Sequence, residues 1–386
     1  MIYLDNAAST QIHESVLASM LPYLKEQYGN PSSIHRYGRL AHKAVEKARK
    51  QVADLINAEP SEIIFTSGGT ESNNTALHGI ALKTPRSQII ISSIEHDAIL
   101  EPCKKLEKSG FNVLYLPVDK FGTVDPIFLK NNLSEKTCLV SIMFGNNEVG
   151  TIQPIKEIAN ICNEKDIPFH TDAVQAVGKI PIDVKKLGVD MLSISSHKIN
   201  GPKGIGALYI KKGIIIDPVI LGGGQERGLR SGTENVANIV GFGKACEIAK
   251  LNLTQNSSLI KNLKDYLITK VLSEITHVTL NGHPDNRLPG NTHFTFLGVN
   301  GEDLIIKLDE NGIAASTGSA CSVHTQKASH VLQSMGFTHE QITGSLRLTI
   351  GVFNTQSDID ETVNILKKIV QELRSVSPFK EKYSFN

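Results

Sequence analysis

Residues 193–206 read SISSHKINGPKGIG and place Lys198 on a turn made largely of small residues. The turn follows an apolar segment typical of a buried strand and leads into a second one at 206–210. A lysine that serves only solubility is expected on an exposed surface, whereas glycines let the backbone come close to a bound group. This stretch therefore predicts that Lys198 meets a specific partner at the end of a strand.

The first 250 residues alternate strand-like and helix-like patterns. The strand-like runs are 62–66, 88–92, 112–116, 137–143, 167–172, 190–195 and 206–210. A helical stripe of apolar residues covers 39–57. Most runs are separated by helix-length segments and several are apolar without alternation, which a mostly parallel sheet covered on both faces requires. The last two runs are joined by a turn and are candidates for antiparallel pairing.

The remainder of the chain indicates a smaller α+β domain. A long helical pattern from about Thr233 to Leu272 contains a polar stretch, 252–258, that we interpret as a bend or a boundary. The predicted organisation is an N-terminal segment (1–14) that packs with the small domain, a large domain (15–252) and a C-terminal domain (253–386). The predicted fold class is α/β with a mostly parallel, mixed central sheet.

Composition argues against several classes of partner. The 40 basic and 39 acidic residues nearly cancel, so no long-range field is expected to attract nucleic acid or an anionic membrane. No apolar run approaches the roughly 18 residues of a membrane helix. The start, MIYLDNAAST, has neither the basic flank nor the apolar core of a signal peptide. We therefore expect a cytoplasmic protein.

The chain has five cysteines, an odd number, scattered and never in CxxC spacing: Cys103, Cys138, Cys162, Cys246 and Cys321. This pattern argues against a disulfide framework or a zinc site and favours reduced thiols. Packing explains the first four, which lie in strand-like or helix-like segments. Cys321 differs because its surroundings, ASTGSACSVHTQKASHVL, are small and polar. We interpret them as a mobile loop.

Polar motifs follow several expected strands, at the edge where an open parallel sheet binds ligands. TSGGTES (66–72) is a glycine-rich turn before a helix, and its amides and the Thr70 hydroxyl suit a phosphate, although such turns are also common without one. No Walker or Rossmann glycine pattern occurs. Asp172 follows an apolar strand and is either a helix N-cap or a carboxylate with a cationic partner. His96 is either a satisfied loop histidine or a ligand contact.

Taken together, these groups match the needs of pyridoxal 5′-phosphate. Lys198 would bind the aldehyde, and Asp172 would keep the pyridine nitrogen protonated. The glycine-rich turn would hold the phosphate, and the flat ring of His96 would cover one face of the cofactor.

The motifs resemble the cysteine desulfurases of the NifS/IscS group, which are fold-type I enzymes of the class V aminotransferase superfamily. Nine motifs carry the resemblance in order along nearly the whole chain: YLDNAAST, GNPSSIHRYG, TSGGTESNN, GNNEVGT, HTDAVQAVGK, SSHKINGPKGIGALY, GGGQERGLRSGTENV, STGSAC and SLRLTIG. The resemblance implies conversion of L-cysteine to L-alanine with a persulfide on Cys321. Acceptor proteins of iron–sulfur cluster assembly, tRNA thiolation or another pathway would then take the sulfur.

The resemblance also implies roles for individual residues. Lys198 would be the Schiff-base lysine, Asp172 the partner of the pyridine nitrogen and Gln175 the partner of the phenolate oxygen. His96 would stack on the ring and take part in catalysis. The residues that would hold the phosphate are Gly69, Thr70, Ser195, Ser196, His197 and, across a homodimer interface, Thr233.

Three further residues complete the implied site. Asn147 would lie beside cofactor and substrate, and Arg347 would pair with the substrate carboxylate, which suits a planar guanidinium. Besides carrying the persulfide, Cys321 would be a transient ligand of an iron–sulfur cluster shared with a scaffold protein.

The chain also departs from the family pattern. Val352 stands where many relatives carry arginine, and His324 and Lys327 replace smaller residues or proline after Cys321. Contacts near Val352, the reach of the loop and the choice of acceptor are therefore open. A selenocysteine lyase, another aminotransferase-family enzyme, an idle scaffold for sulfur transfer and a Cys–His hydrolase are the alternatives. The hydrolase leaves Lys198 and the phosphate turn unexplained.

Overall fold

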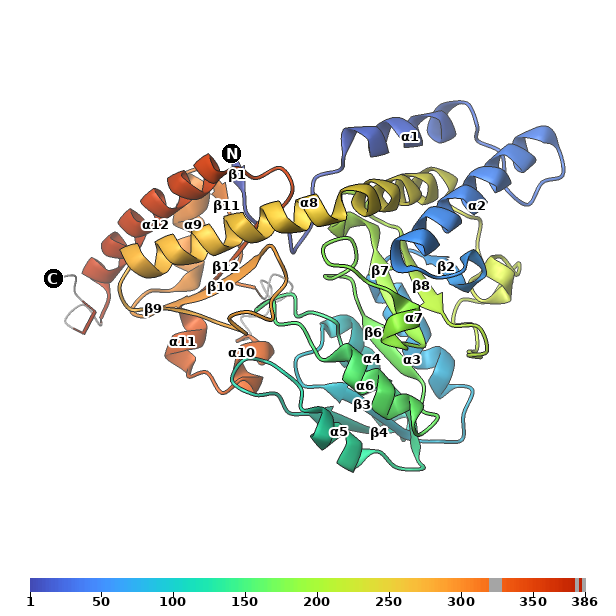
Figure 1. Ribbon diagram of the computed structural model, residues 1–386, viewed down its shortest axis with the longest axis horizontal. Helices are drawn as coiled ribbons and strands as arrows, with labels where there is room; N and C mark the ends of the chain where they lie inside the picture. The colour runs from blue at the N-terminus through green and yellow to red at the C-terminus, as the bar shows by residue number, and fades with distance from the viewer. Residues whose placement is uncertain (319–327, 379–381, 384–386) are drawn as a thin grey trace.

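The computed structural model describes residues 1–318, 328–378, 382 and 383 (Figure 1). The segment 319–327, and with it Cys321, His324 and Lys327, lies outside the described residues. Within the described part, no helix is long and apolar enough to cross a membrane.

A seven-stranded sheet in the order β2-β8-β7-β6-β5-β3-β4 forms the centre of the larger part. Its strands are β2 (Ile63–Thr66), β3 (Gln88–Ser92), β4 (Asn112–Leu116), β5 (Thr137–Ser141), β6 (Phe169–Asp172), β7 (Met191–Ser195) and β8 (Gly206–Ile210). Only β8 runs antiparallel to its neighbours in this sheet. The mostly parallel sheet and the antiparallel pairing of the last two predicted runs are therefore confirmed.

Helices cover both faces of this sheet, as the uninterrupted apolar runs predicted. They are α1 (Glu14–Lys25), α2 (Arg36–Ile56), α3 (Gly69–Ala81), α4 (Asp97–Lys108), α5 (Pro126–Asn132), α6 (Ile155–Asn163) and α7 (Val184–Leu187). In β3, Ile89 and Ile91 pack with α3 and α4, whereas Ile90 packs on the opposite side with α2, α5 and α6. The alternation follows from the two-residue period of a strand.

A three-stranded antiparallel sheet, in the order β12-β10-β9, forms the centre of the smaller part. The elements here are β9 (Val278–Leu280), β10 (Asn291–Phe296), α9 (Gly301–Glu310), α10 (His330–Ser334), α11 (His339–Thr343), β12 (Ser345–Thr349) and α12 (Gln356–Val376). The N-terminal strand β1 (Ile2–Tyr3) pairs in parallel with β11 (Ile313–Ala314). Leu4 is buried in the core of this part, so the first residues of the chain pack with its last third.

One helix, α8 (Val236–Glu274), runs between the two parts (Figure 1). Ile239 and Phe242 belong to the core beneath the large sheet, whereas Leu263 and Leu267 belong to the core of the smaller part. The polar stretch 252–258 lies inside this helix, which continues through it. That stretch therefore marks where α8 passes from one core to the other, and the boundary at residue 252 stays a prediction.

Four of the five cysteines are packing residues. Cys103, Cys138, Cys162 and Cys246 are buried and unbonded to one another, which confirms the prediction made from their segments.

Candidate active site

A cavity of about 640 Å³ opens at the carboxyl ends of the parallel strands. It gathers ten of the residues that the sequence predicted: Gly69, Thr70, His96, Asn147, Asp172, Gln175, Ser195, His197, Lys198 and Arg347. They come from the ends of β6 and β7, from segments after β2, β3, β5, β6 and β7, and from β12. The sheet topology therefore brings together motifs that lie up to 278 residues apart in sequence, from Gly69 to Arg347 (347 − 69).

Asp172 ends β6 and is 7% exposed. Its Oδ2 accepts a hydrogen bond from Asn73 Nδ2 at 2.6 Å, and its Oδ1 accepts one from the backbone N–H of Val174 at 3.0 Å. The two donors fix the orientation of the carboxylate. Sequence reasoning missed Asn73 as a site residue, although it lies three residues after Thr70 on α3 and therefore on the same helix face.

Lys198 ends a short 3-10 helix, η2 (Ser196–Lys198), directly after β7. Its Nζ donates to the carbonyl oxygens of Ala7 at 2.6 Å and Ala8 at 2.7 Å. The Thr10 hydroxyl donates to the His197 carbonyl at 2.9 Å, which ties the same N-terminal segment to the turn. The N-terminal segment thus forms one wall around the lysine, and no sequence pattern indicated this.

The small residues around Lys198 are required by close backbone contacts. A Cβ on Gly201 would lie 2.0 Å from Ser196 Oγ, and a Cβ on Gly206 would lie 2.7 Å from the Cα of Gly68. The second contact packs the strand after the lysine turn against the glycine-rich turn before α3. Larger residues would separate the two turns.

The glycine-rich turn places the amino end of α3 at the cavity. A Cβ on Gly69 would lie 2.8 Å from Val174 Cγ2, so glycine keeps the helix start close to the segment that follows Asp172. Glu71 in the first turn of α3 forms an ion pair with Arg230 (2.8 Å), which offsets its charge. The amides of a helix start, together with the nearby Thr70 and Ser195, favour an anion.

His197 and His96 both border the cavity. Burial and the adjacent Lys198 lower the pKa of His197 to about 4. His96 is the N-cap of α4, and its Nδ1 accepts from the backbone N–H of Ala98 at 3.0 Å. Because Nδ1 accepts, the neutral ring of His96 carries its proton on Nε2.

Arg347 lies in the middle of β12 and is 2% exposed. One Nη donates to the carbonyls of Asn147 (2.9 Å) and Gly318 (3.2 Å), and the other forms an ion pair with Asp5 (2.8 Å). Its buried Nε has no hydrogen-bond partner among the described residues. The site therefore holds a fixed cation with bonding capacity left for a carboxylate.

Two buried carboxyls near the cavity were not predicted. Glu148 lines it, accepts a hydrogen bond from Ser329 Oγ at 2.6 Å, and has its pKa raised by burial. Glu95 is fully buried, and burial raises its pKa to about 8. The available signal was a charged residue beside His96 and another beside Asn147 in otherwise small or apolar motifs.

Three further predicted site residues, Cys321, Ser196 and Thr233, are not among the described residues that line the cavity. Gly318 and Ser329 line the cavity on either side of the segment 319–327, in which Cys321 lies outside the described residues. Ser196 does not line the cavity, and its buried Oγ has no partner within the described part of the chain. Thr233 is exposed and also does not line the cavity. The phosphate contacts of these two residues stay predictions.

Comparison with known proteins identifies relatives along the full chain. The family model for aminotransferase class-V matches residues 2–362. A cysteine desulfurase IscS of Dictyoglomus turgidum is 51% identical over 387 residues, which cover 100% of this chain and 98% of the relative. A cysteine desulfurase IscS of Methanosarcina thermophila is 51% identical and covers 99% and 95%, respectively.

Solved structures are similar in the same way. A NifS-like protein has a TM-score of 0.90 and 39% identity, with 96% of this chain and 99% of that chain covered. A structure described as SspA in complex with cysteine has a TM-score of 0.82 and 37% identity, with 92% and 100% covered.

Proposed function

This chain belongs to the class-V aminotransferase family and is a cysteine desulfurase, and from that membership we propose that its cavity holds pyridoxal 5′-phosphate. The residues present fit this group in three ways. The glycine-rich turn and the amino end of α3 suit the phosphate. Asp172, which accepts hydrogen bonds from uncharged donors, suits a pyridinium. Lys198, which lines the same cavity, suits the aldehyde.

The cofactor, when bound, supplies an electron sink for negative charge at the substrate Cα. Gly69, Thr70, Ser195 and His197 would hold its phosphate, with Ser196 as a further predicted contact. Gln175, which lines the cavity, would face the phenolate oxygen, and the flat ring of His96 would cover one face.

The residues of the chain would then bind and orient L-cysteine. The Arg347 guanidinium, already fixed by Asp5, would receive the substrate carboxylate, with Asn147 beside it. Lys198 Nζ would take the Cα proton. His96 follows β3 and lines the cavity. Because Nε2 of His96 carries the ring proton, this nitrogen would donate a proton to the bound substrate.

Cys321 would receive the sulfur. Its thiolate would attack the substrate sulfur, so that an S–S bond forms while the substrate Cβ–S bond breaks. The electron pair would stay on the carbon fragment, which takes up one proton at Cβ and regains one at Cα from Lys198, and leaves as L-alanine. The resulting persulfide would pass its terminal sulfur to an acceptor thiol.

We further propose a cytoplasmic homodimer that serves iron–sulfur cluster assembly, with tRNA thiolation as a second outlet. The name IscS on relatives about 50% identical supports the first pathway. Exposed apolar side chains near the amino end, such as Leu24, Tyr28 and Ile34, support a covering second subunit. In such a dimer Thr233, which lies outside this cavity, would contact the phosphate of the other site.

The observation that carries the proposal is the convergence of Lys198, Asp172 and Arg347 on one cavity bordered by both flanks of the Cys321 segment. The test is Cys321→Ser, assayed for alanine and sulfide from L-cysteine and, by mass spectrometry, for a protein-bound extra sulfur. The variant should retain cofactor and lose all three products. Cys103→Ala is the matched control, because burial raises the pKa of that thiol to about 12 and makes it unreactive. Full turnover by Cys321→Ser would refute the assignment.

A further inference from the structure

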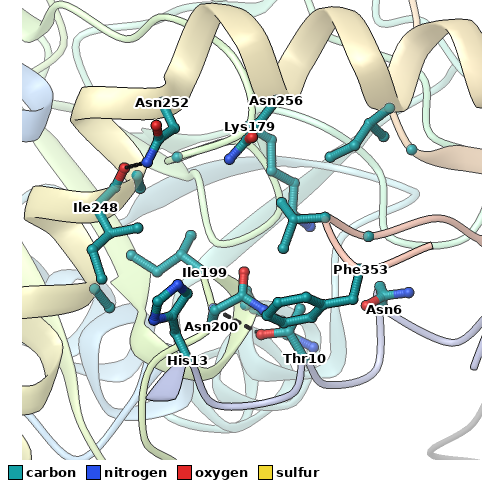
Figure 2. A pocket seen from close by; sticks show the side chains of 18 of the residues that line it. Asn6, Thr10, His13, Lys179, Ile199, Asn200, Ile248, Asn252, Asn256 and Phe353 are labelled. Carbon is teal, nitrogen blue, oxygen red and sulfur yellow. Dashed lines mark hydrogen bonds between the residues drawn. The ribbon is translucent and has the colours of Figure 1, made fainter. Parts of the chain in front are cut away.

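A second cavity lies behind Lys198, the only described residue that lines both this cavity and the active site. Its volume is about 220 Å³. Figure 2 shows its walls: Asn252 and Asn256 of α8 on one side, Thr10 and His13 of the N-terminal segment on another, and Lys179 between them. The proposed reaction makes no use of this space.

The lining of this cavity combines polar donors, positive charge and apolar surface. None of its described lining residues carries a carboxylate, whereas Lys179 and Lys198 both border it. The side chain of Asn256 makes no hydrogen bond with the described residues and lies at the same wall. The apolar part comes from α8 and from the segment after β12, with Ile260, Ile350, Val352 and Phe353 among its members.

Lys179 is a cation without a counter-ion in this lining. Its Nζ donates to Gln175 Oε1 at 3.0 Å, and Gln175 Nε2 in turn donates to the Ala7 carbonyl. No described carboxylate lies within ion-pair distance of Lys179 Nζ. Burial, followed by repulsion from Lys198 and Arg347, lowers the pKa of Lys179 to about 7. An enclosed charge of this kind gains from an anionic partner.

We propose that this cavity binds a small carboxylate, with the carboxylate paired to Lys179 and its short alkyl group against the apolar wall. The absence of an acidic group from the described lining disfavours an amino acid, because its ammonium would meet Lys198 with no counter-ion. The apolar wall disfavours phosphate or sulfate, which would need donors on every side. Propionate matches both requirements.

A carboxylate in this cavity would affect Lys198 through its charge, without contacting the substrate. A carboxylate paired with Lys179 offsets one of the positive charges that face Lys198 and competes with Gln175 for the Lys179 Nζ. By linkage, the anion binds the protonated lysine and raises its pKa. Among the described residues, the other titratable or charged groups near Lys179 are Lys198, Arg347, His197 and His13, which lines the same cavity.

The test is a titration of the cofactor-loaded enzyme with sodium propionate at constant ionic strength. Binding is measured by saturation-transfer NMR of the propionate. Lys179→Gln should weaken binding about tenfold or more, since a hydrogen bond to a charged group is lost. Lys250→Gln is the matched control, because that exposed lysine lies on α8 outside the cavity. Affinity should also fall as the pH rises above about 7, where Lys179 loses its proton.

Two further variants keep the test decisive. Ala249→Leu fills the cavity from α8 without altering charge and should weaken propionate binding even if Lys179→Gln folds poorly. Arg347→Gln, checked for folding by circular dichroism, should leave propionate binding in place. Unchanged affinity in Lys179→Gln would show that Lys179 is not the partner of the anion. Loss of affinity in Arg347→Gln alone would show that the anion binds in the substrate site. Either result would overturn the proposal. Equal binding of L-alanine at the Lys179 cavity would overturn the ligand class.

Discussion

Asn73 Nδ2 lies 2.6 Å from Asp172 Oδ2 and joins the helix of the glycine-rich turn to the carboxylate at the end of β6. Asp172 has the Val174 amide on its other oxygen, so both oxygens are engaged before any cofactor arrives. The contact fixes the direction of the carboxylate relative to the helix start. The same helix therefore serves two proposed parts of the cofactor, its phosphate and its pyridine nitrogen.

Replacing Asn73 by alanine is expected to lower kcat/KM for L-cysteine by about 10- to 100-fold, because one hydrogen bond to a charged group is lost. The pH titration of cofactor absorbance should shift as well, since Asp172 would hold a proton on the pyridine nitrogen less firmly. Asn74→Ala is the matched control, because Asn74 donates to the Thr70 carbonyl and does not line the cavity. An unchanged titration in Asn73→Ala would contradict this role.

Arg347→Lys is expected to raise KM for L-cysteine by about tenfold or more, because an ammonium cannot hold the substrate carboxylate while it also serves Asp5, Asn147 and Gly318. Steady-state kinetics separate this effect from a loss in kcat. If KM stays constant and only kcat falls, Arg347 orients the site without binding the substrate.

Glu95 should make the protein less stable at alkaline pH. Its pKa is raised to about 8 in the folded chain, above the value of about 4.3 that an unfolded chain gives. The folded state therefore holds the extra proton between these values, and stability falls as pH rises through this window, by at most about 1.4 kcal/mol per unit. The loss is complete once the pH is above the folded pKa.

Glu95→Gln removes this dependence while keeping the oxygen that accepts from Ser92 and Met143. Thermal unfolding of the two proteins at pH 5 and pH 9 checks it. Relative to its value at pH 5, the melting temperature of the variant should fall less at pH 9 than that of the parent. Parallel changes in both proteins would mean that Glu95 does not titrate in the window.

The sequence predicts the elements best where a local pattern decides them. The strand at 88–92 was predicted with its observed bounds, because a short apolar run flanked by polar residues predicts a buried strand in a sheet that helices cover on both faces. The run at 137–143 was predicted two residues too long. Met143 instead lines the cavity, and its backbone N–H donates to the buried Glu95.

Parts of the site that depend on distant pairs could not be predicted from local patterns. The Asp5–Arg347 ion pair and the bonds from Lys198 to Ala7 and Ala8 join segments separated by more than 180 residues. No periodicity encodes such contacts, and the residues involved are ordinary on their own. The family motifs located Arg347 and Lys198 but gave no sign of the backbone carbonyls that hold the lysine.

Gly69→Ala is expected to weaken cofactor binding by steric displacement rather than by loss of a donor. The new Cβ would lie 2.8 Å from Val174 Cγ2, closer than such atoms approach, so the start of α3 or the segment after Asp172 must move. Either movement misaligns the helix amides with the proposed phosphate. The dissociation constant of the cofactor, measured by fluorescence on the stripped protein, should rise about tenfold, in line with about 1.4 kcal/mol of lost interaction.

A second substitution isolates that cause. Val174→Ala removes the obstructing methyl groups, so the double variant Gly69→Ala/Val174→Ala should recover most of the lost affinity, while Val174→Ala alone should change it little. Helix propensity offers no competing explanation, because alanine favours a helix more than glycine does. If the double variant binds as weakly as Gly69→Ala, the contact with Val174 is not what requires glycine at the helix start.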